Sequence, residues 1–105
     1  MLFHKEEKDE ITYYHIIGLE DLEFFFSIRE YIIKNFHAIL HREDIGIFTA
    51  KAYFLIDTEE VTLEFHEDIG IFFYSPKGGN KHILEKIAQD LENRLANVGW
   101  TENPT

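Results

Sequence analysis

The chain has 105 residues and carries twenty acidic against ten basic side chains, a formal net charge of -10. Apolar residues make up 45% of it and aromatic residues 15%, which is enough for a packed core and excludes a disordered acidic tail. The charge disfavours nucleic acid and anionic membranes as partners and favours basic proteins or cations. The chain has no cysteine, which excludes disulfides, thiolate metal ligands and a cysteine nucleophile.

No apolar run approaches the roughly 20 residues of a membrane-spanning helix. The charged first ten residues lack the apolar centre of a signal peptide. We therefore expect a soluble, cytoplasmic protein with a single domain over residues 1–105, frayed at residues 1–10 and ending in a C-terminal tail at residues 98–105.

The first two predicted elements are a strand over Ile11–Ile17 and a long helix over Leu22–Leu40. The strand is rich in β-branched and aromatic residues, and the helix has apolar residues at three- and four-residue steps. A second apolar stripe, Phe24, Ile28 and Tyr31, lies nearly opposite the first. This stripe is either covered within the domain or forms the interface with a partner or a second copy.

Three strands follow, over Ile45–Ile56, Val61–His66 and Ile69–Tyr74. Their short connections predict an antiparallel meander. Asn80 is a candidate N-cap for a closing helix that runs to about Asn97. The order strand, helix, three strands, helix predicts an α+β domain: an antiparallel sheet of about four strands with both helices packed on one face.

The hexapeptide Glu-Asp-Ile-Gly-Ile-Phe occurs twice, at Glu43–Phe48 and at Glu67–Phe72. We interpret each copy as two carboxylates in a solvated turn followed by an apolar strand. An antiparallel meander places Glu43, Asp44, Glu67 and Asp68 at one end of the sheet. It places Asp57, Glu59 and Glu60 at the opposite end, near the start of the last helix.

Three histidines accompany these carboxylates. His37 and His41 are one helical turn apart, and with His66, Glu67 and Asp68 they make a zinc-like site conceivable. Alternatively, they mark a solvated helix end where His41 complements the helix dipole. Carboxylates beside histidine could also transfer protons, but catalytic groups need partial burial and these residues are predicted in turns. We expect no metal, no cofactor and no enzymatic activity.

Two further features have alternative explanations. Arg29 lies on the apolar face of the first helix, where it either extends to an edge or pairs with a strand carboxylate. A second group lies on the sheet face away from the core. It is either a set of cross-strand contacts or an aromatic surface rimmed by acids, as in protein-binding sites. This group consists of Tyr53, His66, Phe72 and Tyr74.

In size, acidity and lack of a catalytic motif, the whole chain resembles the small acidic immunity proteins of bacterial toxin systems, such as the contact-dependent growth inhibition immunity proteins. The resemblance implies a cytoplasmic bacterial protein that binds a basic toxin, a nuclease, and occludes its active site. Its carboxylates would pair with the Lys and Arg that the toxin uses on phosphates. The predicted partner-binding residues are Glu43, Asp44, Asp57, Glu59, Glu60, Glu64, His66, Glu67, Asp68, Phe72 and Tyr74.

Two alternatives stay open. The stretch Tyr53–Phe65, with the strand and helix after it, is similar to small acidic type III secretion chaperones, which are dimers that wrap an effector segment. Those chaperones usually begin with a helix, whereas this chain is predicted to begin with a strand. A homodimer of this kind would use Phe24, Ile28 and Tyr31. The other alternative is a small enzyme or metal-binding protein that uses the histidine and carboxylate cluster.

Overall fold

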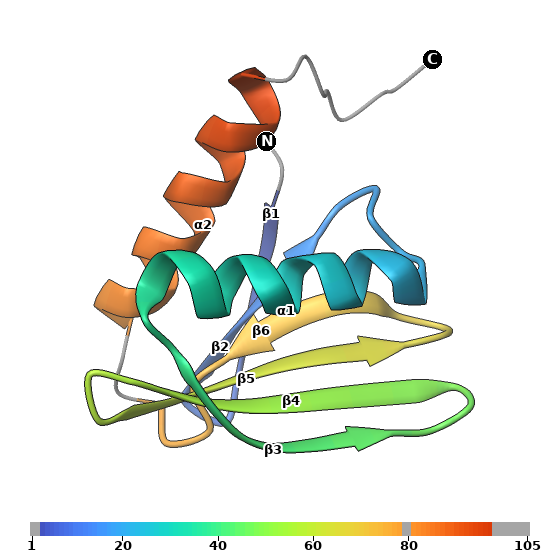
Figure 1. The fold of residues 1–105 in the computed structure, drawn as a ribbon, viewed down its shortest axis with the longest axis horizontal. Helices are drawn as coiled ribbons and strands as arrows, with labels where there is room; N and C mark the ends of the chain where they lie inside the picture. Colours follow the sequence, from blue (N-terminus) through green and yellow to red (C-terminus); the bar gives the residue numbers. More distant parts are fainter. Residues whose placement is uncertain (1–2, 79–80, 98–105) are drawn as a thin grey trace.

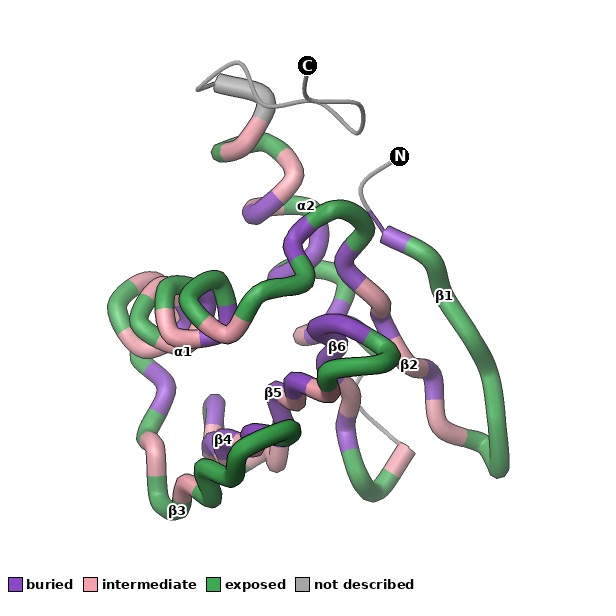
Figure 2. The backbone as a smooth tube through the Cα atoms, turned by 90° about the vertical axis from the view of Figure 1, so that its right-hand side faces the viewer, coloured by how far each residue is buried: buried purple, intermediate pink, exposed green. Residues whose placement is uncertain are grey.

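The computed structural model describes residues 3–78 and 81–97. Six strands form one antiparallel sheet in the order β1-β2-β6-β5-β4-β3, and both helices lie on the same face of it (Figures 1 and 2). The domain is therefore α+β, with its core between this face and the helices. In chain order the elements are β1 (Phe3–Lys8), β2 (Ile11–Ile16), α1 (Leu22–Phe36), β3 (Ile39–Ile45), β4 (Thr49–Ile56), β5 (Glu59–His66), β6 (Gly70–Tyr74) and α2 (Lys81–Asn97).

The core follows from the two-residue period of the strands. Along β4, every second side chain is buried and those between are partly or fully exposed. The same alternation in β2 and β5 directs apolar side chains at the helices. The core side chains of β4 are Ala50, Ala52, Phe54 and Ile56, and the helices meet them with Phe25, Ile28 and Ile32 from α1 and Leu84, Ile87, Ala88 and Leu91 from α2.

The prediction of about four strands in the order strand, helix, three strands, helix is wrong, because two strands were missed. One is β1, in the segment predicted to be frayed. It pairs with β2 from Phe3↔Ile16 to Lys8↔Ile11, and its charged side chains are tolerated because an edge strand is exposed to water. Asp9 and Glu10 form the turn with φ of 54° and 66°. Such two-residue turns usually contain Asn-Gly or Asp-Gly, so the sequence lacked the expected signal.

The other missed strand is β3. The helix predicted to reach Leu40 ends at Phe36, and His37 follows in the left-handed region with φ of 51°. The predicted strand Ile45–Ile56 is not continuous: it contains the last residue of β3, the turn at residues 46–48 and then β4, which pairs back onto β3 as a hairpin. Leu40 continued the helical spacing but reaches the core from a strand, opposite Phe54. Apolar spacing over so few residues does not distinguish a helix from a strand.

Two of the three residues in the second stripe of α1, Ile28 and Tyr31, are covered within the domain. Ile28 is buried, and the Tyr31 hydroxyl donates to Asp90 Oδ2 of α2 at 2.6 Å. Burial and this bond raise the pKa of Tyr31. Hydrogen bonds from the Tyr31 hydroxyl and from Arg94 Nε, at 2.7 Å, lower the pKa of Asp90. Of the three predicted interface residues, only Phe24 is exposed.

Two predicted features lie outside the described residues: the Asn80 N-cap and the tail at residues 98–105. Neither helix, as far as it is described, is both long and apolar enough to cross a membrane.

The Asp90 contacts predict a pH-dependent stability. Because folding lowers the Asp90 pKa, its contribution is full above the unfolded value of about 3.9 and is lost as the pH falls through the folded value. We expect Asp90→Asn to lower the free energy of unfolding by about 1 kcal/mol at neutral pH, and this difference to shrink below about pH 4. Urea titrations across this range measure it. Asp9→Asn, in an exposed turn, is the control, and an Asp90→Asn difference that does not change with pH contradicts the assignment.

Candidate functional site

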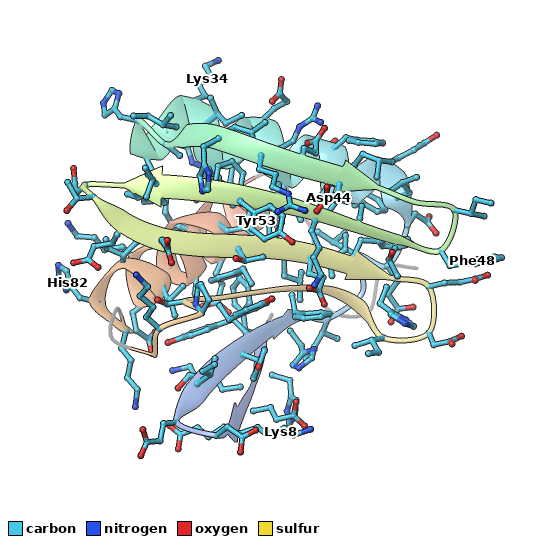
Figure 3. The ribbon with its side chains drawn as sticks, turned by 90° about the horizontal axis from the view of Figure 1, so that it is seen from below. Lys8, Lys34, Asp44, Phe48, Tyr53 and His82 are labelled. Atoms are coloured by element: carbon cyan, nitrogen blue, oxygen red, sulfur yellow. The ribbon has the colours of Figure 1, made fainter. Side chains whose placement is uncertain are left out.

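Three segments from different parts of the chain meet at one end of the molecule. The Glu67 amide donates to the Phe48 carbonyl at 2.9 Å, which joins the β5–β6 turn to the β3–β4 turn. The loop between β2 and α1 lies beside them, because a side chain at Gly70 would lie 3.6 Å from Glu20 Cγ. Both turns and the start of α1 lie together at the right of Figure 1. Phe48 and His82 mark this end and the opposite end in Figure 3.

This end is strongly anionic. Its segments, residues 17–24, 45–49 and 66–70, contain no Lys or Arg. They hold five carboxylates, none of which forms an ion pair with any residue in the described ranges. Their charge is therefore not neutralised locally. We call this surface the acidic end and define it by Glu20, Asp21, Glu23, Glu67 and Asp68.

Exposed apolar side chains gather at the same place. Ile47 is 86% exposed and Phe48 59%. They occupy the centre of the β3–β4 turn, which Gly46 closes by donating its amide to the Thr49 carbonyl at 2.8 Å. Turn centres usually hold Gly, Pro, Asn or Asp, so folding does not explain two large apolar residues there. We call the exposed group the apolar tip: Ile17, Phe24, Ile45, Ile47, Phe48 and Ile69.

The five carboxylates differ in their structural role. Glu20, Asp21 and Glu23 lie at the start of α1, where the helix dipole favours negative charge. Glu67 and Asp68 have no such role, because the hydrogen bonds of their turn use other groups: the Asp68 amide donates to His66 Nδ1 at 3.1 Å, and the Ile69 amide to the His66 carbonyl at 3.1 Å. None of these hydrogen bonds uses the Glu67 or Asp68 carboxylate, so Glu67 and Asp68 are the best candidates for function.

The predicted site residues do not all come together. His66, Glu67 and Asp68 lie at the acidic end, but Glu43 and Asp44 lie inside β3 instead of in a turn. The prediction of a solvated acidic turn is wrong for the first hexapeptide copy, because the missed strand contains its two carboxylates. The turn of that copy forms at its second half, residues 46–48.

Glu43 and Asp44 point to opposite faces of the sheet and are both paired. Arg29 Nη1 of α1 donates to Glu43 Oε2 at 2.7 Å, with each side chain about one-fifth exposed. Arg29 therefore pairs with a strand carboxylate, one of its two expected arrangements. Asp44 lies on the face away from the helices, 3.0 Å from Arg42 Nη2. Neither carboxylate adds to the acidic end.

Predicted aromatic residues on the face away from the helices form cross-strand contacts. Phe72 is buried there, with ring centroids 6.2 Å from Tyr13, 5.1 Å from His15 and 6.1 Å from Tyr74. Tyr53 points from the same face (Figure 3). Phe72 is therefore covered, and the contacts account for its position without a partner.

The charges at the centre of this face are also paired. Glu64 accepts from the Tyr74 hydroxyl at 3.3 Å and lies 3.2 Å from Lys51 Nζ. Glu64 raises the pKa of Lys51, and burial, with Glu64, raises that of Tyr74. Together with the Arg42–Asp44 pair, this arrangement leaves little unbalanced negative charge on the face.

The opposite end of the sheet has mixed charge. Glu60 lies 3.8 Å from Lys77 Nζ. Asp57 and Glu59 line a hollow together with His82 and Lys86 of α2. The cations beside these carboxylates distinguish this end from the acidic end, which has none.

The three histidines do not converge. His37 follows α1, His41 lies at the β3 bulge with its ring 6.3 Å from that of Tyr53, and His66 lies at the acidic end. In residues 3–78 and 81–97, no three His, Asp or Glu side chains are placed to hold a metal ion.

Sequence reasoning missed Glu20, Asp21 and Glu23 as site residues because they fit a helix start. It missed Phe48 and Ile69 because they fit the core face of predicted strands. The available signal was Gly46, a turn former inside the predicted strand. No protein-family model, curated protein or solved structure matches the chain, so the candidate residues are assigned from geometry and charge.

The Arg29–Glu43 pair predicts a stability effect. Glu43→Gln leaves a largely buried guanidinium without its charged partner, and we expect it to lower the free energy of unfolding by about 1–3 kcal/mol. Glu30→Gln is the matched control, because Glu30 lies 3.5 Å from Arg29 Nε but its side chain is 66% exposed. Denaturant unfolding of both variants tests this. Equal losses of unfolding free energy would contradict the view that Glu43, and not Glu30, is the stabilising partner of Arg29.

Proposed function

We propose that this chain is an acidic binding module of the immunity type, which neutralises a basic toxin domain in the cytoplasm by occluding its active site. A nuclease is the toxin class whose chemistry fits best, because its active site binds phosphates with Lys and Arg. The observation that carries the proposal is the acidic end. Its five carboxylates form no ion pair with any described residue, and they lie around the exposed Ile47 and Phe48.

The two components of this end have separate physical roles. Carboxylates attract a cationic surface over the range of a Debye length and speed association. They also pair with guanidinium and ammonium groups at contact. The apolar tip provides side chains that can fill a pocket, and such buried anchors supply most of the affinity in protein interfaces. Charge alone would bind many basic proteins, so shape at the tip provides the selectivity.

The chaperone alternative loses most of its predicted interface. Ile28 is buried and Tyr31 is bonded to Asp90 of α2, so neither is available without moving α2. The chain also begins its described part with two strands instead of a helix. No described feature favours the chaperone over the toxin inhibitor.

Charge reversal at the acidic end tests the proposal. The test first asks whether a gene next to that of this chain encodes a basic toxin; such a toxin, purified as an inactive variant, is then the partner. We expect Glu67→Lys with Asp68→Lys to lower the association rate constant about tenfold or more at low salt, and the difference to shrink as salt screens the charges. Stopped-flow or surface-based kinetics measure this.

The matched control is Asp57→Lys with Glu59→Lys, which makes the same change in net charge at the opposite end. Equal slowing by the two pairs would show that only overall charge matters. Association rates that do not respond to salt would overturn the electrostatic mechanism.

The apolar tip predicts a different kinetic effect. Phe48→Ala removes a contact made only after docking, so we expect the dissociation rate to rise about tenfold or more with little change in association. Ile39→Ala is the control, because Ile39 is 63% exposed at the other end of β3. Co-expression with the active toxin gives a second readout. If Phe48→Ala keeps both residence time and protection of growth, the tip is not in the interface.

A further inference from the structure

β3 is an open edge of the sheet. It is last in the strand order and pairs only with β4. Antiparallel pairs alternate between those that exchange hydrogen bonds and those that do not. Because Gly46 bonds to Thr49, Asp44 and Arg42 direct their backbone groups at β4, while Glu43 and Ile45 direct theirs outward. Such outward groups are a template for a further strand.

The two edges of the sheet differ in how well they are protected against pairing with a further strand. On β1, the five residues after Phe3 are all exposed and are charged or His, which discourages pairing. β3 also carries His and charged residues at its centre, but on either side of them it presents two large apolar residues, Ile39 and Ile45, which are 63% and 48% exposed. The edge of β3 is therefore the one suited to pairing.

Two copies of β3 that are related by a two-fold axis have complementary charges. Arg42 and Asp44 lie on the same face, one on each side of Glu43. An antiparallel second copy centred on Glu43 sets Arg42 opposite Asp44 of that copy, and Asp44 opposite its Arg42. Moving the centre to Arg42 or to Asp44 sets like charges against each other, which is unfavourable. We propose that β3 pairs antiparallel with β3 of a second copy, centred on Glu43, so that one sheet continues across the dimer.

The charge at the centre of this arrangement is already compensated. Glu43 meets Glu43 of the second copy on the helix face, but each carboxylate holds its own Arg29 at 2.7 Å. Arg29 also lies over the Phe26 ring, 4.9 Å from its centroid. This places the partly buried Phe26 beside the β3 edge, so a second copy covers further apolar surface there. The dimer uses C2 symmetry, the commonest arrangement of soluble homo-oligomers.

A charge swap tests the register. By sedimentation velocity at about 100 µM chain, where micromolar dimers are populated, we expect the wild type at twice the 12.5 kDa of one chain. Arg42→Asp and Asp44→Arg should each weaken the dimer about tenfold or more, and the double variant should restore it. Lys8→Asp makes the same charge change as Arg42→Asp on the other edge strand and should keep the dimer.

The result that overturns the proposal is a monomeric wild type, a dimer that tolerates both single reversals, or a double variant that stays monomeric. Circular dichroism of each variant separates loss of pairing from loss of folding.

Cysteine cross-linking gives a second measurement that does not depend on affinity. The chain has no cysteine, so introduced thiols react only with each other. Because Arg42 and Asp44 face each other across the axis, an oxidised mixture of Arg42→Cys and Asp44→Cys should give the mixed disulfide dimer, whereas either variant alone should stay uncross-linked. Mass spectrometry distinguishes the products. Cross-linking within one variant, or none in the mixture, contradicts the register.

Discussion

The covering of one sheet face by two helices is the constraint on which the rest of this structure depends. A strand alternates its side chains between faces, so once Phe54, Leu63 and Phe73 point at the helices, their neighbours must lie on the opposite face of the sheet. On that opposite face, charges pair and aromatic rings contact each other across strands. The surfaces that remain available for function are therefore the turns and the sheet edges, where the alternation stops.

The acidic end arises from this topology. Alternate hairpins of an antiparallel sheet turn at the same end, and the first helix begins beside them. Three segments that are distant in sequence therefore meet at one small surface, to which two contribute carboxylates and the β3–β4 turn contributes apolar side chains. Several acids elsewhere are paired: Glu43 with Arg29, Asp44 with Arg42, and Glu64 with Lys51. The net charge of -10 is thus distributed unevenly over the molecule, although the sequence shows only its total.

Alternation in β4 and β5 made their buried face predictable, and the short connections predicted that β4, β5 and β6 form a meander. The edge strands were not predictable in this way. β1 is charged on both faces because the water at a sheet edge does not penalise it, and the Asp9-Glu10 turn needs positive φ without containing Gly. The first two residues of β3, Ile39 and Leu40, continued the apolar spacing of α1. Glu67 and Asp68 could be placed from sequence because a turn was the only option between two clear strands, whereas Phe48 could not be placed once its hairpin was missed.

The two proposed surfaces are neighbours on one hairpin and share Ile45, which lies both at the end of β3 and in the apolar tip. The edge of β3 would meet a second copy, and the turn after it would meet a basic partner. In an antiparallel arrangement the acidic ends of the two copies point in opposite directions along the shared sheet. Their mutual repulsion then acts over distances that exceed the Debye length of about 8 Å at physiological salt, so the charge that attracts the partner need not prevent pairing. Salt also separates the two interactions, since screening weakens attraction to a cationic partner while it relieves repulsion between identical acidic chains.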